Sequence, residues 1–282
     1  RDCLDYDGDG LLDVIIQPSK LAGTIDLLRG LGDGTFEFST LATYPFSFQG
    51  KVSPVLPNGD RNYASVFNGT VELVPLRTPA YQSQFRESYA FGSLRYNHQS
   101  DEQPLALADL TGDGVLDAVF GTASLGPVSV TVPSLRFLVG NGDGSFGSAI
   151  EIAPVLASQL EVVDLNGDGE LDIVAATYEP SPTARVYLGL GAGQFAPGGE
   201  VPLSTADVLI ATGDFTSDGA PDLVLAPSTG GLLLLRGLGD GSFDPAASIV
   251  DTTIYSSLAT TDFDHDAFLD LAVVSNAQGE LQ

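Results

Sequence analysis

The chain has 282 residues, of which 43% are hydrophobic, and a formal net charge of -26 at pH 7. A chain of this length can bury a substantial core. So acidic a composition argues against binding to nucleic acid or to an anionic membrane, because both attract basic patches. No apolar run approaches the roughly 18 residues that a membrane-spanning helix needs.

The first residue and the single cysteine indicate how the chain was processed and whether it contains disulfides. It begins at Arg1 and contains no methionine, so we expect a mature or trimmed piece of a longer protein. Cys3 has no partner within the sequence, which excludes an internal disulfide framework and leaves open a partner outside this chain.

An acidic nine-residue segment recurs about every 50 residues along the chain. Intact copies occupy residues 5–13, 109–117, 164–172, 214–222 and 262–270, and a degenerate copy occupies residues 56–64. Oxygen-bearing side chains stand at positions one, three, five and nine, and glycine at position six permits a tight bend. Hard oxygen donors without histidine or thiolate favour Ca²⁺ over zinc or copper.

The intact copies therefore predict about five structural Ca²⁺ sites. The predicted side-chain ligands are Asp5, Asp7, Asp9, Asp13, Asp109, Thr111, Asp113, Asp117, Asp164, Asn166, Asp168, Asp172, Asp214, Thr216, Asp218, Asp222, Asp262, Asp264, Asp266 and Asp270. The alternative is a solvated acidic turn without an ion, but five copies between similar strand signals favour the metal loop.

The copies differ in their expected strength. Thr111 and Thr216 offer a neutral oxygen at position three, which predicts weaker sites, and Ala267 replaces the bend glycine of the last copy. The degenerate copy has Leu56 and Ala64 at its two ends, so we expect no metal there.

Each acidic segment lies within a repeated pattern of strand signals. A short apolar run precedes it, a β-branched run follows it, and a third apolar run ends in a glycine-rich turn. That turn precedes a phenylalanine that should open a fourth strand and pack between neighbouring units; these residues are Phe36, Phe146, Phe195 and Phe243.

Such a unit predicts a four-stranded antiparallel meander, and no segment has helical periodicity. Repeated meanders of about 50 residues indicate an all-β fold, a β-propeller, with about six blades begun and five complete. We expect residues 1–282 to form a single propeller domain.

The acidic segments resemble the FG-GAP or VCBS repeats of integrin α subunits and many bacterial surface proteins. The resemblance covers essentially the whole chain and implies a seven-bladed ring to which these blades would contribute. It also implies a further Ca²⁺ ligand, the backbone carbonyl of position seven, which belongs to Leu11, Val115, Glu170, Ala220 and Phe268.

The resemblance implies a non-enzymatic, extracellular or cell-surface module for adhesion, for protein or carbohydrate binding, or for scaffolding. Extracellular modules bind Ca²⁺ at about 0.1 to 1 mM, which agrees with that location. A polysaccharide lyase or hydrolase and a subunit of a larger extracellular assembly remain alternatives. The sequence shows no nucleophile elbow, phosphate loop, zinc spacing or EF-hand.

Two further segments each allow a functional and a structural interpretation. Residues 78–103 combine aromatic residues with arginines and either contact a ligand or extend the second blade; the aromatic members are Tyr81, Phe85, Tyr89, Phe91 and Tyr96. Asn68 begins a glycosylation signal, but Asn68 and Gly69 also form a strong hairpin signal, which we prefer. His98 and His265 are isolated in the sequence, and we expect solvated loop positions for both.

Overall fold

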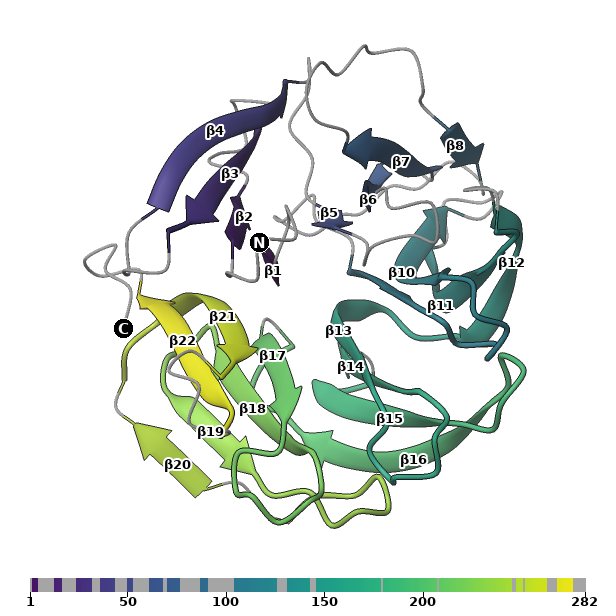
Figure 1. The fold of residues 1–282 in the computed structure, drawn as a ribbon. Coiled ribbons are helices and arrows are strands. Elements are labelled where there is room, and N and C mark those ends of the chain that lie inside the picture. Colours follow the sequence, from purple (N-terminus) through teal and green to yellow (C-terminus); the bar gives the residue numbers. More distant parts are fainter. Residues whose placement is uncertain are drawn as a thin grey trace. The chain divides into compact units, whose positions relative to one another are not determined.

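A computed structural model describes most of residues 104–275 and, before them, the strands of residues 2–90 together with residue 31. The gaps after residue 104 are 126–130, 143–145, 179, 207, 245–246, 251 and 263–267. Every regular element in the described residues is a β-strand (Figure 1). The described residues therefore contain no helix that could span a membrane.

The chain separates into two compact units, Arg1–Glu102 and Gln103–Gln282. The first unit contains two four-stranded antiparallel sheets. Their strands are β1 (Asp2–Leu4), β2 (Asp13–Ile16), β3 (Thr24–Gly30), β4 (Phe36–Thr43), β5 (Gly50–Val52), β6 (Arg61–Phe67), β7 (Thr70–Leu76) and β8 (Glu87–Ala90). Whether both units form one domain stays a prediction.

The second unit contains three four-stranded sheets and a final two-stranded sheet. The first two sheets consist of β9 (Leu105–Ala108), β10 (Asp117–Leu125), β11 (Thr131–Gly140) and β12 (Phe146–Ala153), and of β13 (Ala157–Val163), β14 (Asp172–Thr177), β15 (Thr183–Gly189) and β16 (Phe195–Pro202). The last two consist of β17 (Val208–Gly213), β18 (Asp222–Pro227), β19 (Leu232–Leu235) and β20 (Ala247–Val250), and of β21 (Tyr255–Thr261) and β22 (Asp270–Ser275).

Each four-stranded sheet is an antiparallel meander in chain order, as expected for propeller blades. In the second unit the first strands of successive sheets, β9, β13, β17 and β21, contact one another in turn. The fourth strands β12, β16 and β20 lie on the outer side of this unit (Figure 1). Within the described residues, five four-stranded sheets and one two-stranded sheet confirm the predicted all-β fold class, with six blades begun and five complete.

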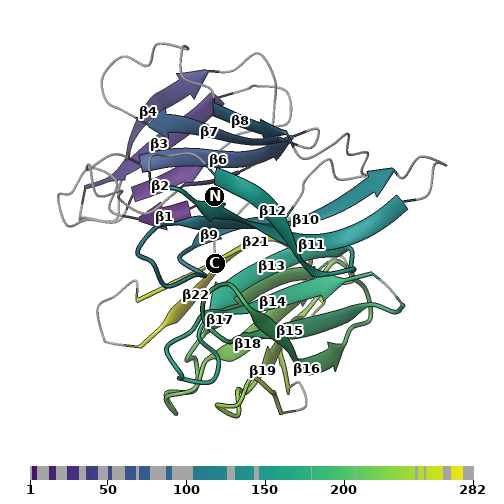
Figure 2. The ribbon, with the colours of Figure 1, turned by 90° about the vertical axis from the view of Figure 1, so that its right-hand side faces the viewer.

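Three hydrophobic clusters hold the sheets of the second unit together. One cluster joins Phe137 and Val119 to Ile173 of the next sheet, and a second joins Val174 to Leu223. A third packs Val224 against Tyr255 and Val273. Because successive residues of a strand point to opposite faces, β14 and β18 supply both neighbouring clusters and are buried along their whole length. Figure 2 shows β14 between β13 and β15 of its sheet.

The fourth strand begins at the predicted phenylalanine in three sheets, at Phe36, Phe146 and Phe195. In the fifth sheet Phe243 forms only an isolated bridge with Gly237, and β20 begins later, at Ala247. The sequence offers a reason, because Pro245 has no N–H to donate to a ladder.

Candidate metal loops

The acidic segments connect the first and second strands of the blades. In all five intact copies the position-nine aspartate opens the second strand and pairs with the residue directly before position one. The pairs are Asp13 with Leu4, Asp117 with Ala108, Asp172 with Val163, Asp222 with Gly213 and Asp270 with Thr261. The repeat in the sequence is therefore a repeat in β-sheet register.

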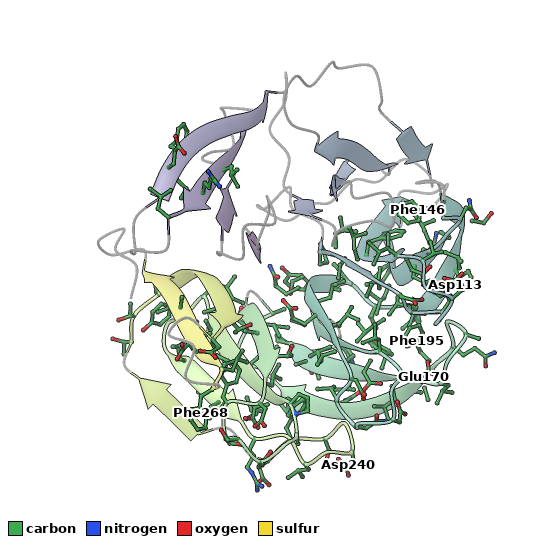
Figure 3. All side chains as sticks on the ribbon, in the orientation of Figure 1. Asp113, Phe146, Glu170, Phe195, Asp240 and Phe268 are labelled. Atoms are coloured by element: carbon green, nitrogen blue, oxygen red, sulfur yellow. The ribbon has the colours of Figure 1, made fainter. Side chains whose placement is uncertain are left out.

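Three of these loops, 109–117, 164–172 and 214–222, are described completely. In loops 5–13 and 262–270 the interior residues Asp5, Asp7, Asp9, Leu11, Asp264 and Asp266 lie outside the described residues. Asp262 and Asp270 are described at the ends of the last loop, and the Phe268 side chain is 57% exposed (Figure 3). Their assignment as Ca²⁺ ligands stays a prediction.

The position-nine aspartates of the three completely described loops are buried hydrogen-bond acceptors. Asp172 is 0% exposed; one carboxylate oxygen accepts from the Leu165 amide at 2.8 Å and the other from the Gly189 amide at 2.7 Å. Asp117 and Asp222 have the same arrangement, each with three backbone donors. Each carboxylate thus fastens its loop to the end of the third strand of its own blade. We call this set of hydrogen bonds from the loop and third-strand amides to the position-nine carboxylate the backbone clip.

The connection requires a glycine at the end of the third strand, as in β11 and β15, or shortly after it, as in β19. A Cβ atom at Gly189 would clash with the carbonyl oxygen of Leu171, and the same holds for Gly140 with Leu116 and for Gly237 with Pro221. Only glycine lets the two backbones approach closely enough for the amide to reach the carboxylate. This role was not predicted from the sequence, although a glycine recurs before each glycine-rich turn and marks the position.

Position one supports the bend of the loop. Asp164 accepts the amides of Gly167 at 2.8 Å and Gly169 at 3.0 Å through its two oxygens. Gly169, the predicted bend glycine, has a φ of 88°, and its equivalents Gly114 and Gly219 have φ angles of 84° and 89°. These positive φ angles agree with the expected requirement for glycine.

Position five faces the backbone in the same way. The carboxylates of Asp113, Asp168 and Asp218 accept the amide two residues later, at 2.8, 2.8 and 3.0 Å. Backbone amides therefore satisfy part of the acceptor capacity of each loop. An ionised carboxylate offers about four lone-pair sites, so these oxygens retain capacity for a cation.

The carboxylates also act on one another. Burial raises the pKa of Asp172 above its ordinary value of 3.8; the amides of Gly189 and Leu165 oppose this, and the charges of Asp168 and Asp164 raise it further. Burial likewise raises the pKa of Asp117, with a further contribution from Asp113. A cation in the loop would relieve this repulsion and favour the ionised form.

Position three differs between the loops. The Thr111 hydroxyl oxygen is buried and has no hydrogen-bond partner. Asn166 instead donates to Asp168 at 2.9 Å and accepts the Asp168 amide at 3.0 Å. The partnerless oxygen of Thr111 and the oxygen-only donor set fit a hard cation such as Ca²⁺.

No group of three or more His, Cys, Asp or Glu side chains in the described part of the chain has the arrangement of a preformed metal site. The loop carboxylates point to backbone amides instead. The ligand assignments therefore stay predictions, including those of the position-seven carbonyls of Val115, Glu170 and Ala220.

The glycine-rich turn of one blade contacts the acidic loop of the preceding blade. Gly193 donates its amide to the Leu110 carbonyl at 3.2 Å, and a Cβ at this position would lie 3.3 Å from the Thr111 methyl group. The Phe195 ring meets Phe137 of the preceding sheet edge to face, with centroids 6.1 Å apart (Figure 3). This contact confirms the predicted inter-blade position of Phe195.

Other candidate residues fall largely outside the described part of the chain. Apart from the strand residues of β6 and β8, the structure does not describe the degenerate segment 56–64 or the aromatic segment 78–103. Asn68 and Gly69 lie outside the described residues too, but the strands beside them pair Phe67 with Thr70, as a two-residue hairpin requires.

Sheets of this kind, whose first two strands are joined by acidic hairpin loops, define a repeat protein built from β-propeller blades. The family model described as the FG-GAP-like repeat matches residues 5–57, 109–175, 164–225 and 214–273. These segments cover well over half of the chain, and the chain belongs to this family. No curated protein sequence matches it significantly.

Solved structures share the fold at low sequence identity. An Agrocybe aegerita lectin, solved for its specific recognition of non-reducing terminal N-acetylglucosamine, is 18% identical with a TM-score of 0.60, over 97% of this chain and 73% of the lectin. BBS1N in complex with ARL6DN is 12% identical with a TM-score of 0.54, over 99% of this chain and 89% of the other. A Photorhabdus luminescens Tc holotoxin pore chain is 18% identical with a TM-score of 0.51, and this chain spans 13% of it.

Proposed function

We propose that this chain is a non-enzymatic, calcium-stabilised propeller module that binds a glycan or protein ligand outside the cell. One observation carries the proposal. The three completely described loops hold aspartates at positions one, five and nine in the same hydrogen-bonded frame between the first two strands of successive blades. Carboxylates so placed repel one another, and a divalent cation would offset that repulsion.

The expected affinity supports an extracellular location. Ca²⁺ sites of extracellular modules have dissociation constants of about 0.1 to 1 mM, and such sites would remain empty at cytosolic concentrations. A site filled at ten times its dissociation constant adds roughly 1.4 kcal/mol to the free energy of unfolding. Several such sites would contribute a large part of a typical domain stability of about 5 to 15 kcal/mol.

A binding role is favoured over catalysis because charged side chains on the described strands are paired with one another across the sheets. Arg185 on β15 pairs with Glu200 on β16, and Arg136 on β11 pairs with Glu151 on β12 at 3.6 Å. These pairs lie across β-ladders, where they stabilise the sheet. The family match and the lectin with the same fold support glycan recognition as the first ligand class to test.

The test is a glycan array probed with the chain in 1–2 mM Ca²⁺ (about the extracellular level) and again in chelator. The array should include glycans with terminal N-acetylglucosamine as well as acidic polysaccharides. Selective binding that is lost in chelator is the expected result. Release of unsaturated fragments from an acidic polysaccharide would instead support a lyase and contradict the non-enzymatic proposal.

A further inference from the structure

One of the three completely described loops already has a cation within reach. In loop 214–222, the Arg236 Nε atom donates to the Asp218 carboxylate, at position five, over 2.6 Å. A guanidinium nitrogen of Arg236 also lies 3.9 Å from the Asp244 carboxylate. The arginine therefore lies between two acidic side chains, one of which is a predicted Ca²⁺ ligand.

The position of Arg236 in the blade explains this contact. It is the residue directly before Gly237, whose amide is held by Asp222 at 2.9 Å. The same backbone clip that fastens the loop to the third strand thus places the residue before the glycine beside the loop. The pairing of the third strand with the second therefore places residue 236 beside the loop.

The two other blades whose acidic loops are completely described have apolar residues at this register position. Val139 precedes Gly140, and Leu188 precedes Gly189. In loop 164–172 the position-five carboxylate of Asp168 receives a neutral amide donor from Asn166 instead of a cation. Arg29 precedes Gly30 in the first blade, but the acidic loop of that blade lies outside the described residues.

Loop 214–222 also departs from its neighbours within the loop itself. Position four is Ser217 with a φ of 57°, where the other two completely described loops have Gly112 and Gly167. A serine in this region is strained. The loop therefore combines a strained backbone position with a side-chain cation.

We propose that Arg236 supplies to loop 214–222 the positive charge that Ca²⁺ supplies to loops 109–117 and 164–172, so that loop 214–222 is organised without a metal ion. This inference rests on the proposed calcium function and assigns which loops take the ion. An arginine side chain stays charged at all relevant pH values. A Ca²⁺ ion bound by Asp218 would have to displace the Arg236 guanidinium or bind beside it. Two positive charges on the same carboxylate repel each other.

The test counts bound Ca²⁺ by equilibrium dialysis and calorimetric titration on the whole chain. Asp218→Asn should leave the number of bound ions unchanged, whereas Asp168→Asn should lower it by one. Arg236→Leu, which copies Leu188, should add one ion or strengthen the weakest site at least about tenfold. Arg136→Leu is the matched control, since its partner Glu151 lies on the neighbouring strand and in none of the acidic loops.

The outcomes separate this proposal from the proposed function. If Asp218→Asn loses one ion from the wild-type chain, loop 214–222 binds Ca²⁺ despite Arg236, and the assignment is overturned while the calcium function stands. An unchanged count and affinity in Arg236→Leu would also overturn it. If the wild-type chain binds no Ca²⁺ at all, the proposed calcium function itself fails. Melting curves of each variant in chelator confirm that the counts refer to folded protein.

Discussion

The buried aspartate at position nine gives the sharpest prediction, because the structure assigns it a role that does not depend on metal. Asp172→Asn keeps the size of the side chain but replaces one acceptor oxygen by a donor. One of the two amides it holds, from Leu165 or Gly189, then faces an N–H group instead of an oxygen. Asp172 is 0% exposed, so water cannot replace the lost acceptor.

The expected cost is that of one unsatisfied buried amide, about 1 to 3 kcal/mol. For a unit of this size that corresponds to a melting temperature lower by roughly 3 to 10 °C. The measurement is thermal unfolding followed by circular dichroism, in chelator and in excess Ca²⁺. The loss should appear in both conditions, since the hydrogen bonds exist without the ion.

Asp168→Asn is the matched control in the same loop. Asp168 is exposed, and asparagine can still accept the Glu170 amide through its remaining oxygen. This variant should match the wild-type melting temperature in chelator and lose only the stabilisation by Ca²⁺. If Asp172→Asn also matched the wild type in chelator, the position-nine residue would be a metal ligand alone, and the proposed clip would be refuted.

Three further predictions test other parts of the structure. Gly189→Ala should destabilise the second unit by more than about 1 kcal/mol in urea titrations, because its methyl group meets the Leu171 carbonyl; Gly147→Ala, with only an ordinary contact at 3.5 Å, should not. Phe195→Leu should cost about 0.5 to 1.5 kcal/mol through loss of the ring contact with Phe137, and an unchanged urea midpoint would argue against an inter-blade role. In chelator, burial raises the pKa of the Asp117 and Asp172 carboxyls above 3.8, so the folded state binds protons more readily and the contribution of these groups to stability falls as pH rises from that value. The melting temperature in chelator should thus be higher near pH 4 than near pH 7, and the increment due to Ca²⁺ should be larger near pH 7. A melting temperature in chelator that rises over this interval would contradict the cause given.

The sequence predicted the blades because strand, loop and turn signals recur together. The acidic loop defines the register of the first two strands so closely that Asp117, Asp172 and Asp222 occupy equivalent pairs. Both faces of β14 are buried, in agreement with the continuous apolar run from residue 173 to residue 176. An alternating apolar and polar pattern would instead indicate a strand with one buried face.

The chemistry within the loops was harder to predict. The acidic residues were identified as a set, but their separate roles depend on which amide each oxygen reaches. The clip of Asp222 needs the amide of Gly237, 15 positions away in the chain, and Arg236 is beside Asp218 only because of that clip. Contacts of this kind follow from the pairing of the third strand with the second and not from the nine-residue pattern.

The central claim is that Ca²⁺ bound in the acidic loops stabilises the propeller blades. The most direct test is the melting temperature of the wild-type chain in chelator and at increasing Ca²⁺. Each filled loop should add roughly 1.4 kcal/mol at ten times its dissociation constant, which raises the melting temperature by about 3 to 6 °C. A melting temperature that does not change between chelator and millimolar Ca²⁺ would contradict the claim.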